Sequence, residues 1–320
     1  MNNKYYSIGV DTSNYTTSIA VVDNGFRVIA DERMPLEVSQ GERGLRQSNA
    51  FFKHIHNLPV LLEKIFQCID SSLVRCVAVS SRPRPLEGSY MPVFTSGQAI
   101  SKSIAAAIGT SYFEYSHQEG HIRAGNISSN LSNFVCLHIS GGTTEILKVN
   151  TIPSGYNIDL LGGTQDISIG QLIDRIGVEL GFSFPCGSAL DDIASGFKGE
   201  ETHILKDIFI DRMKMNLSGI ETQCLKQIEK GVEPQIIIHE LFEKISKALI
   251  SVIDNVVQAA EINNVLLVGG VSASRYIREY ITPRLKNRGI CVYFGEPQYA
   301  SDNAVGIAMM GMDELRKFHK

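Results

Sequence analysis

The chain has 320 residues and a formal net charge of −4, with 30 Lys and Arg against 34 Asp and Glu. Because 43% of the residues are apolar, the composition is that of a globular protein and excludes a disordered chain. No stretch approaches the roughly 20 consecutive apolar residues of a membrane-spanning helix, and the polar start is unlike a secretion signal. The six cysteines form no C-x-x-C pair, which indicates reduced thiols and a cytoplasmic protein.

A strand-rich segment opens the chain, and helices and strands then alternate. Pro59 is expected to kink or divide the first helix, because proline lacks the N–H group that an internal helical turn needs. The predicted strands are Tyr6–Asp11, Ser18–Asp23, Arg27–Glu32 and Val74–Ser80, and the predicted helices are Gln47–Cys68 and Ser96–Ile108.

The same order of elements returns in the second part of the chain. The predicted strands there are Phe134–Ser140, Glu145–Val149, Tyr156–Leu161, Val265–Val268 and Cys291–Phe294, and the predicted helices are Ile167–Leu180, Ile236–Ala260, Ser274–Leu285 and Asn303–Phe318. Since the order appears twice, we predict an α/β fold of two similar lobes. The N-terminal lobe would comprise residues 1–132 plus 300–320, and the second lobe residues 133–299.

Three turns that follow predicted buried strands carry small residues suited to binding phosphate. They are Gly9–Ser13, Ile139–Thr144 and Leu267–Ser272. Glycine lets backbone N–H groups approach a ligand, and neighbouring hydroxyls add donors. Each turn taken alone also fits an ordinary tight turn, but the three together favour a nucleotide site between two lobes. Neither a Walker loop nor a G-x-G-x-x-G dinucleotide motif occurs.

A second group of residues suits a metal ion. His117 and His121 are four residues apart, so a helix would place both imidazoles on one face. Asp302 is the best candidate for a third ligand, and Asp11, at a strand end, is predicted to be catalytic as the partner of a metal ion or a polarised ligand atom. Alternatively, the histidines cap a helix or bond buried carbonyls, and Asp302 is an ordinary N-cap. A zinc protease of the H-E-x-x-H type is disfavoured, because Gln118 follows the first histidine.

The motifs, taken in order, resemble those of a known family. They are D-T-S-x-x-x-T-S from Asp11, H-x-E-G-H from His117, S-G-G-T-T from Ser140, G-x-x-x-D-R from Gly170 with F-P-x-G beyond it, G-G-V-S-A-S from Gly269 and S-D-N-A from Ser301. This order is similar, over nearly the whole chain, to that of the TsaD-type threonylcarbamoyl transferases, long labelled O-sialoglycoprotein endopeptidases. The chain is identified as a divergent member of this family.

The resemblance implies the fold of the actin, sugar-kinase and heat-shock ATPase superfamily, in which two ribonuclease-H-like lobes surround a nucleotide cleft. It also implies transfer of a threonylcarbamoyl group from threonylcarbamoyl-adenylate to N6 of a tRNA adenosine next to the anticodon. One iron or zinc ion per chain would be held by His117, His121 and Asp302, and would polarise the carbamoyl carbonyl or hold phosphate. ATP or the acyl-adenylate, with or without Mg²⁺, would be the bound nucleotide.

The nucleotide-binding and substrate-binding residues that the resemblance implies fall in the second lobe. Asp174 would bind the ribose, Gly187 would lie in a proline–glycine turn, and Asp191 would contact the substrate. The full set is His138, Ile139, Ser140, Gly141, Gly142, Thr143, Asp174, Gly187, Asp191, Gly269, Gly270 and Ser274.

The chain departs from the family pattern at three places. Thr143 stands where the family has histidine, and Ser274 where it has a nucleotide-binding asparagine. The segment 81–90, with two arginines and two prolines, replaces a flexible G-P-G loop and is either a solvated basic loop or a contact to a substrate phosphate or carboxylate. The changes at Thr143 and Ser274 favour a second hypothesis, a non-catalytic or differently specific nucleotide-binding paralogue that serves as a partner-binding subunit. The enzyme is favoured because the chain keeps Asp11, Asp174, His117, His121 and Asp302. An endopeptidase has no support in the motifs.

The mildly acidic composition also bears on partners. Because such a chain has no general attraction for nucleic acid, tRNA would be bound through a local patch or with the help of a second protein. We expect a homodimer or heteromeric partner proteins of the threonylcarbamoylation pathway, and no membrane.

Overall fold

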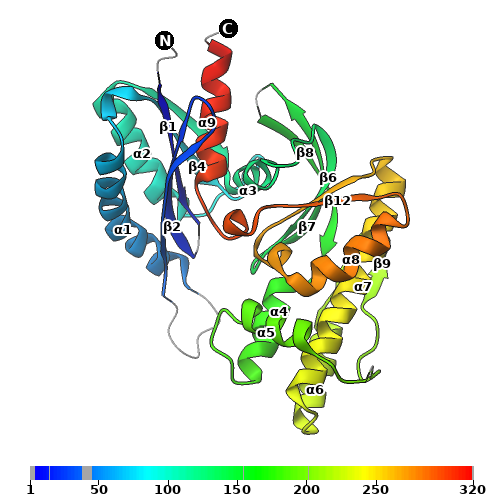
Figure 1. The fold of residues 1–320 in the computed structure, drawn as a ribbon. Coiled ribbons are helices and arrows are strands. Elements are labelled where there is room, and N and C mark those ends of the chain that lie inside the picture. The colour runs from blue at the N-terminus through cyan, green and yellow to red at the C-terminus, as the bar shows by residue number, and fades with distance from the viewer. Residues whose placement is uncertain (1–3, 14, 38–44, 154, 201, 319–320) are drawn as a thin grey trace. The chain divides into compact units, whose positions relative to one another are not determined.

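The chain forms two compact units (Figure 1). The N-terminal unit consists of Met1–Ile127, Ile152–Tyr156 and Ser301–Lys320, and the second unit of Ser128–Thr151 and Asn157–Ala300. The computed structural model describes residues 4–13, 15–37, 45–153, 155–200 and 202–318. Within these residues, no helix combines the length and the apolar composition that crossing a bilayer requires.

Five strands form the sheet at the centre of the N-terminal unit. They are β1 (Tyr6–Thr12), β2 (Thr16–Asp23), β3 (Val28–Pro35), β4 (Val74–Arg82) and β5 (Ser111–Ser116). Their order is β3-β2-β1-β4-β5. β1, β2 and β3 are antiparallel neighbours, whereas β1, β4 and β5 run parallel. The carboxyl ends of β1, β4 and β5 therefore meet at one edge of the sheet.

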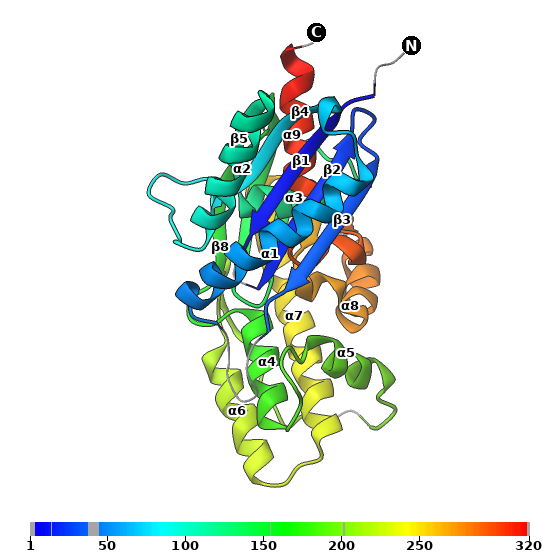
Figure 2. The same cartoon turned by 90° about the vertical axis from the view of Figure 1, so that its left-hand side faces the viewer.

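Helices cover both faces of this sheet (Figure 2). α1 (Gln47–Cys68) and α2 (Phe94–Ile108) pack on one face, and α9 (Val305–Phe318) packs on the other, where it also contacts α3 (His117–Gly125). The apolar side chains of β1 and β4 are fully buried between these layers and form the core of the unit.

α1 is one continuous helix, so the expectation that Pro59 divides it is wrong. Leu58 and Leu61, on either side of the proline, are fully buried in the core of the N-terminal unit. Because tertiary packing of an apolar face supplies most of the stability of a helix in a protein, this burial outweighs the missing hydrogen bond.

The second unit repeats the strand order of the first. Its strands are β6 (Asn133–Ile139), β7 (Thr144–Ile152), β8 (Gly155–Thr164), β9 (Phe209–Asp211), β10 (Lys214–Asn216), β11 (Asn264–Val268) and β12 (Cys291–Phe294). The sheet order is β12-β11-β6-β7-β8-β10-β9. Without the short β9 and β10, the sequence β8-β7-β6-β11-β12 matches β3-β2-β1-β4-β5 strand for strand. β6 again pairs antiparallel with its successor, β7, and parallel with β11.

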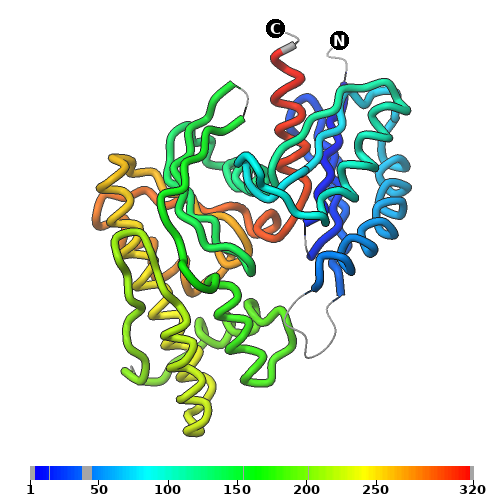
Figure 3. The backbone as a smooth tube through the Cα atoms, turned by 180° about the vertical axis from the view of Figure 1, so that it is seen from behind, coloured from blue at the N-terminus to red at the C-terminus, as the bar shows by residue number. Residues whose placement is uncertain are grey.

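Helices α4 (Ile169–Glu179), α5 (Gly187–Gly196), α6 (Ser218–Glu229), α7 (Pro234–Ala260) and α8 (Arg275–Lys286) complete the second unit. α7 contacts α5, α6 and α8, and its apolar face supplies much of the core. α6 and α7 lie side by side as a helical hairpin (Figures 1 and 3). Short 3₁₀ helices among the described residues are η1 (Ser71–Leu73), η2 (Gly270–Ala273) and η3 (Pro297–Tyr299).

Candidate active site

α3 begins at His117 because Ser116 caps it. The Ser116 hydroxyl accepts a hydrogen bond from the N–H of Glu119, and the Glu119 carboxylate accepts one from the N–H of Ser116. His117 and His121 therefore lie one turn apart on the same helix, and neither is its N-cap. The alternative in which these histidines cap a helix is wrong.

Asp302 lies in the segment between η3 and α9. The side chain of Asn303, not that of Asp302, accepts the hydrogen bond from the N–H of Val305 at the start of α9. The alternative in which Asp302 is the helix N-cap is therefore wrong as well. Instead, the Ser13 hydroxyl donates to Oδ2 of Asp302 at 2.8 Å, and Oδ1 lies toward the two histidines.

His117, His121 and Asp302 present three ligand atoms to one point in the N-terminal unit. Nε2 of His117 is 3.1 Å from Nε2 of His121, and Oδ1 of Asp302 is 3.5 Å from the first nitrogen and 3.2 Å from the second. Ligands about 2.1 Å from a metal ion, with bond angles of about 90–110°, are spaced about 3.0–3.4 Å apart. The three atoms thus have the spacing of one face of a coordination shell, and two imidazoles with a carboxylate suit iron or zinc.

Asp11 contacts the Nδ1 side of the His117 ring, whereas the other two ligand atoms lie on its Nε2 side. Its Oδ1 is 2.9 Å from Nδ1 of His117, and its side chain is fully buried. A carboxylate at Nδ1 keeps a proton on that nitrogen and leaves Nε2 available to a metal ion. Oδ2 of Asp11 accepts a hydrogen bond from the N–H of Ser13 at 3.3 Å. In this geometry Asp11 positions a histidine, and its predicted catalytic role stays a prediction.

The two carboxylates favour a positive charge at the His117 imidazole. Burial alone would lower the pKa of His117, but the neighbouring Asp11 and Asp302 raise it to about 10. Burial would raise the pKa of both carboxyl groups, but His117 lowers the pKa of Asp11, and the two histidines hold that of Asp302 well below its usual value. The electrostatics of this cluster are therefore those of a cation site.

His54, a buried histidine of α1, holds the backbone of Ser13 next to the site. The sequence does not predict this role. Nε2 of His54 donates to the carbonyl oxygen of Ser13 at 2.8 Å, and Nδ1 accepts from the Thr17 hydroxyl at 2.7 Å. The ring is fully buried, and burial lowers its pKa, so it is neutral. The sequence feature that could have indicated it is a histidine on the apolar face of the predicted helix Gln47–Cys68.

The two glycine turns of the second unit meet at one edge of its sheet. One follows β6 and the other follows β11, which are parallel neighbours. Gly269 has φ of +91°, and a Cβ there would lie 2.5 Å from the carbonyl oxygen of Ile139, so the two turns are in direct contact. The predicted residues that the turns bring together are His138, Ile139, Ser140, Gly141, Gly142, Thr143, Gly269 and Gly270.

The N-terminus of α4 packs against the first of these turns. The Ser168 hydroxyl donates to the carbonyl oxygen of Gly141 at 2.7 Å, and the N–H of Ile169 donates to the Thr144 hydroxyl at 2.9 Å. By contrast, a Cβ on Gly141 or Gly142 would meet no atom within 4 Å. The backbone of both glycines is thus open to a ligand, while the turn is fixed from one side.

Asp174 binds the start of α5. Its Oδ1 accepts from the N–H of Cys186 at 2.7 Å, and Gly187 is the first residue of the helix. Burial raises the pKa of Asp174 although these N–H groups oppose the shift. The ribose-binding role predicted for Asp174 stays a prediction.

Asp191 and Ser274 bind each other at the start of α8. The Ser274 hydroxyl donates to Asp191 and accepts from the N–H of Ile277. The Asp191 carboxylate also accepts from the N–H groups of Arg275 and Tyr276. The structure brings this predicted pair together and uses both side chains to cap a helix, so their substrate contacts stay predictions.

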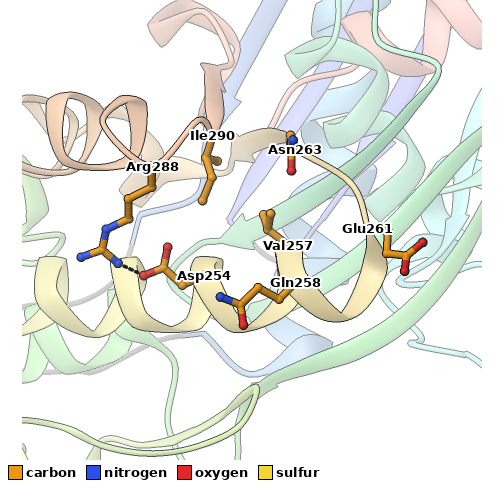
Figure 4. Close-up of a pocket in the computed structure, with 7 residues that line it drawn as sticks. All are labelled: Asp254, Val257, Gln258, Glu261, Asn263, Arg288 and Ile290. Carbon is orange, nitrogen blue, oxygen red and sulfur yellow. Dashed lines mark ion pairs between the residues drawn. The ribbon is translucent and has the colours of Figure 1, made fainter.

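A cavity of about 510 Å³ lies in the second unit, and Figure 4 shows the residues that line it. It opens beside the starts of β11 and β12, whereas the second glycine turn follows the end of β11. An ion pair between Asp254 and Arg288 crosses it. Its lining residues are Asp254, Val257, Gln258, Glu261, Asn263, Arg288 and Ile290, none of which is predicted for the site.

Comparisons with known proteins point to one family. A family model described as tRNA N6-adenosine threonylcarbamoyltransferase (TsaD) matches residues 37–309. A protein of that name from Thermotoga neapolitana is 28% identical over 318 residues, which cover 97% of this chain and 94% of the relative.

Solved structures with the same fold belong to other proteins. One is an activator of the 2-hydroxyisocaproyl-CoA dehydratase from Clostridium difficile, with bound ADPNP. Its TM-score is 0.56 at 14% identity, and the match covers 98% of this chain and 97% of the activator chain. A ROK family glucokinase from Streptomyces griseus has a TM-score of 0.53 at 10% identity, with coverages of 96% and 99%. Such low identities show the fold alone, and they confirm the predicted α/β fold of the actin, sugar-kinase and heat-shock ATPase type.

Proposed function

The chain belongs to the TsaD family of tRNA N6-adenosine threonylcarbamoyltransferases, and from this premise we propose that it transfers a threonylcarbamoyl group to N6 of an adenosine in tRNA. The family resemblance drawn from the motifs is confirmed by the match over residues 37–309. We propose threonylcarbamoyl-adenylate as the donor and the adenosine next to the anticodon as the acceptor. The observation that carries the proposal is the cluster of His117, His121 and Asp302 in a chain of this family.

We further propose that these three residues hold one divalent ion, iron or zinc. The donor types, their spacing and the two buried carboxylates around the imidazoles support this assignment. When bound, the ion would supply a Lewis acid that polarises the carbamoyl carbonyl or holds phosphate. Asp11 keeps the proton on Nδ1 of His117, and Ser13 keeps Asp302 turned so that its other oxygen faces the histidines.

The glycine turns of the second unit are the proposed site for ATP or the acyl-adenylate, with or without Mg²⁺. Gly141 and Gly142 are open to a ligand, and the buried Ser272 hydroxyl has no hydrogen-bond partner among the described residues. In the reaction the N6 amine attacks the carbamoyl carbon and loses a proton, the bond to the phosphate oxygen breaks, and AMP leaves. Backbone N–H groups and a hydroxyl at the phosphate would stabilise the charge on this leaving group.

The remaining assignments rest on the same proposal. We propose that the two units correspond to the predicted lobes, residues 1–132 plus 300–320 and residues 133–299, although the N-terminal unit ends its first segment at Ile127 and also includes Ile152–Tyr156. Partner proteins of the threonylcarbamoylation pathway, or a second copy of the chain, would assist a mildly acidic protein in holding tRNA. The tRNA substrate and the six free thiols support a cytoplasmic location.

The direct test supplies the purified protein with threonylcarbamoyl-adenylate and unmodified tRNA and measures the modified nucleoside by mass spectrometry. We expect product, about one iron or zinc per chain, and the loss of both in His121→Ala. The matched control is His56→Ala, which removes an exposed histidine of α1 and should leave both unchanged. No product from metal-loaded protein, with a standard family enzyme active in the same assay, would favour the non-catalytic paralogue instead.

A further inference from the structure

The loop between β4 and α2 leaves the sheet at the edge where the candidate metal site lies. We define it as the arginine loop, residues Arg82–Tyr90. β4 stands between β1 and β5, whose carboxyl ends lead into the metal cluster. Arg82 pairs in register with Ser116, the N-cap of α3, and the N–H of Gln118 donates to the carbonyl oxygen of Pro83 at 3.1 Å. The loop therefore starts beside the first turn of the helix that carries both histidines.

The side chains of the arginine loop are unusual for a loop that only connects two elements. Tyr90 is 67% exposed and Leu86 is 53% exposed, although both are large and apolar. Arg84 is exposed and Arg82 half-buried, and together they outnumber the loop's single acidic residue, Glu87. A chain with a net charge of −4 thus carries a locally basic and aromatic surface on a loop that starts beside α3, the helix of the two histidines.

The arginine loop is held in shape by its own contacts. The N–H of Arg84 donates to the Ser89 hydroxyl at 3.1 Å, and the N–H of Ser89 donates to the carbonyl oxygen of Leu86 at 3.1 Å. Gly88 takes φ of +76° within this turn, and two prolines stiffen the first half of the loop. Figure 2 shows it in cyan, extending from the sheet before α2. A loop ordered before binding loses little conformational entropy on binding.

We propose that the arginine loop binds the anticodon stem-loop of the acceptor tRNA, with Arg82 and Arg84 at backbone phosphates and Tyr90 stacked on an unpaired base. The inference rests on the proposed function, because an adenosine that reacts at the metal site must approach past the elements around it. Guanidinium groups bind phosphate through paired hydrogen bonds, and exposed aromatic rings stack on unpaired RNA bases. The two residue types occur here together, at the edge where the reaction would take place.

The test measures RNA binding and turnover in the full-length protein. An unmodified, fluorescent anticodon stem-loop is titrated with wild type, Arg82→Ala/Arg84→Ala, Tyr90→Ala and Tyr90→Phe. We expect the double variant to bind about ten-fold more weakly and to lower the slope of log affinity against log salt by about one to two. Tyr90→Ala should weaken binding at least about five-fold, and Tyr90→Phe should restore it, because stacking needs only the ring. The matched control is Arg75→Ala, an exposed arginine at the other end of β4.

The KM values of the transfer reaction distinguish this inference from the alternatives. We expect the double variant to raise KM for tRNA by about the same factor as it weakens RNA binding, with KM for threonylcarbamoyl-adenylate and metal content unchanged. A rise in KM for the adenylate alone would make the loop a small-molecule phosphate site and overturn the proposal. Unchanged RNA affinity in both the double variant and Tyr90→Ala would overturn it too, and would leave the loop as a protein contact. If wild type binds the stem-loop through these residues but forms no product, the proposed function fails and the inference stands.

Discussion

Gly306, on α9, lies so close to the carbonyl oxygen of Gly120, on α3, that a Cβ on Gly306 would overlap that oxygen. In the same contact, a Cβ on Gly120 would lie 2.9 Å from the side chain of Ile307. α3 carries both histidines of the proposed metal site, and α9 directly follows the segment that carries Asp302. Because Gly120 and Gly306 have no side chains, α3 and α9 pack closely against each other. This close packing sets how near the three ligand atoms lie to one another.

We predict that Gly306→Ala separates α3 from α9 and costs the protein its metal site. Overpacking at a close helix contact should lower the free energy of unfolding by about 1–3 kcal/mol, measured by urea denaturation. Bound iron or zinc, measured by elemental analysis, should fall well below that of wild type. Gly219→Ala makes the same change on α6, where a Cβ meets no atom within 4 Å, and should leave metal content unchanged. Equal metal content in the two variants would contradict the prediction.

Asp11→Asn tests the carboxylate behind His117. The amide can still accept the hydrogen bond from Nδ1, but it no longer adds negative charge to the ligand. We expect metal affinity, measured by competition with a chelator, to fall about 10–100-fold while the fold is retained. Asp70→Asn changes an exposed carboxylate of the same unit that caps η1, and its metal affinity should equal that of wild type. An unchanged affinity in Asp11→Asn would mean that Asp11 does not act through the metal site.

The parts of the site that the sequence predicts are those with a local signature. A spacing of four residues identifies His117 and His121, and paired glycines after apolar strands identify both turns of the second unit. Asp302 has no such spacing, because 181 residues separate it from His121. It is a candidate through its acidic side chain before the last helix, and the family motif then implies the same residue. His54 and Gly306 could not be assigned to the site, because their roles follow from helix packing.

The elements that the sequence does not predict are those that bury few residues. α6 buries only Ile220 and Cys224, so its apolar periodicity is weak. α5 begins and ends in glycine and buries only Leu190 and Ala194. β5 is an edge strand with two buried residues at its end, and β9 and β10 have three residues each. A pattern of buried positions is the main signal in a single sequence, and these elements provide too little of it.

We predict that alanine substitutions of Gly269 and Gly270, in the turn that follows β11, affect different properties of the protein. Gly269→Ala forces a side chain into the left-handed region and against the carbonyl oxygen of Ile139, so we expect a loss of about 1–3 kcal/mol of stability. Gly270→Ala meets no atom within 4 Å and should change stability by less than about 0.5 kcal/mol. Its methyl group enters the space proposed for phosphate, so calorimetry should show weaker ATP binding. Unchanged ATP affinity in Gly270→Ala would remove this turn from the nucleotide site.

Glu240, on α7, holds the segment before β9 through three hydrogen bonds. Its carboxylate accepts from the Thr202 hydroxyl and from the N–H groups of Ile204 and Leu205, at 3.0 and 2.8 Å, and its side chain is buried. Burial would raise the pKa of Glu240, but these hydrogen bonds outweigh it and lower the pKa below 4.5. The carboxylate therefore stabilises the second unit in its charged form.

A lowered pKa in the folded state fixes the sign of the pH dependence. The stability due to Glu240 is present above the unfolded-state pKa of about 4.5 and is lost as the pH falls through the folded-state value. Glu240→Gln should lower stability by about 1–3 kcal/mol near neutral pH, because its amide group leaves donors poorly paired. Its loss of thermal stability from about pH 6 to about pH 3 should be smaller than that of wild type. Glu243→Gln changes a carboxylate on the same helix whose ion-pair partner among the described residues is Lys247. We expect it to cost less than about 0.5 kcal/mol and to keep the wild-type pH profile. Matching profiles for all three proteins would refute the assignment.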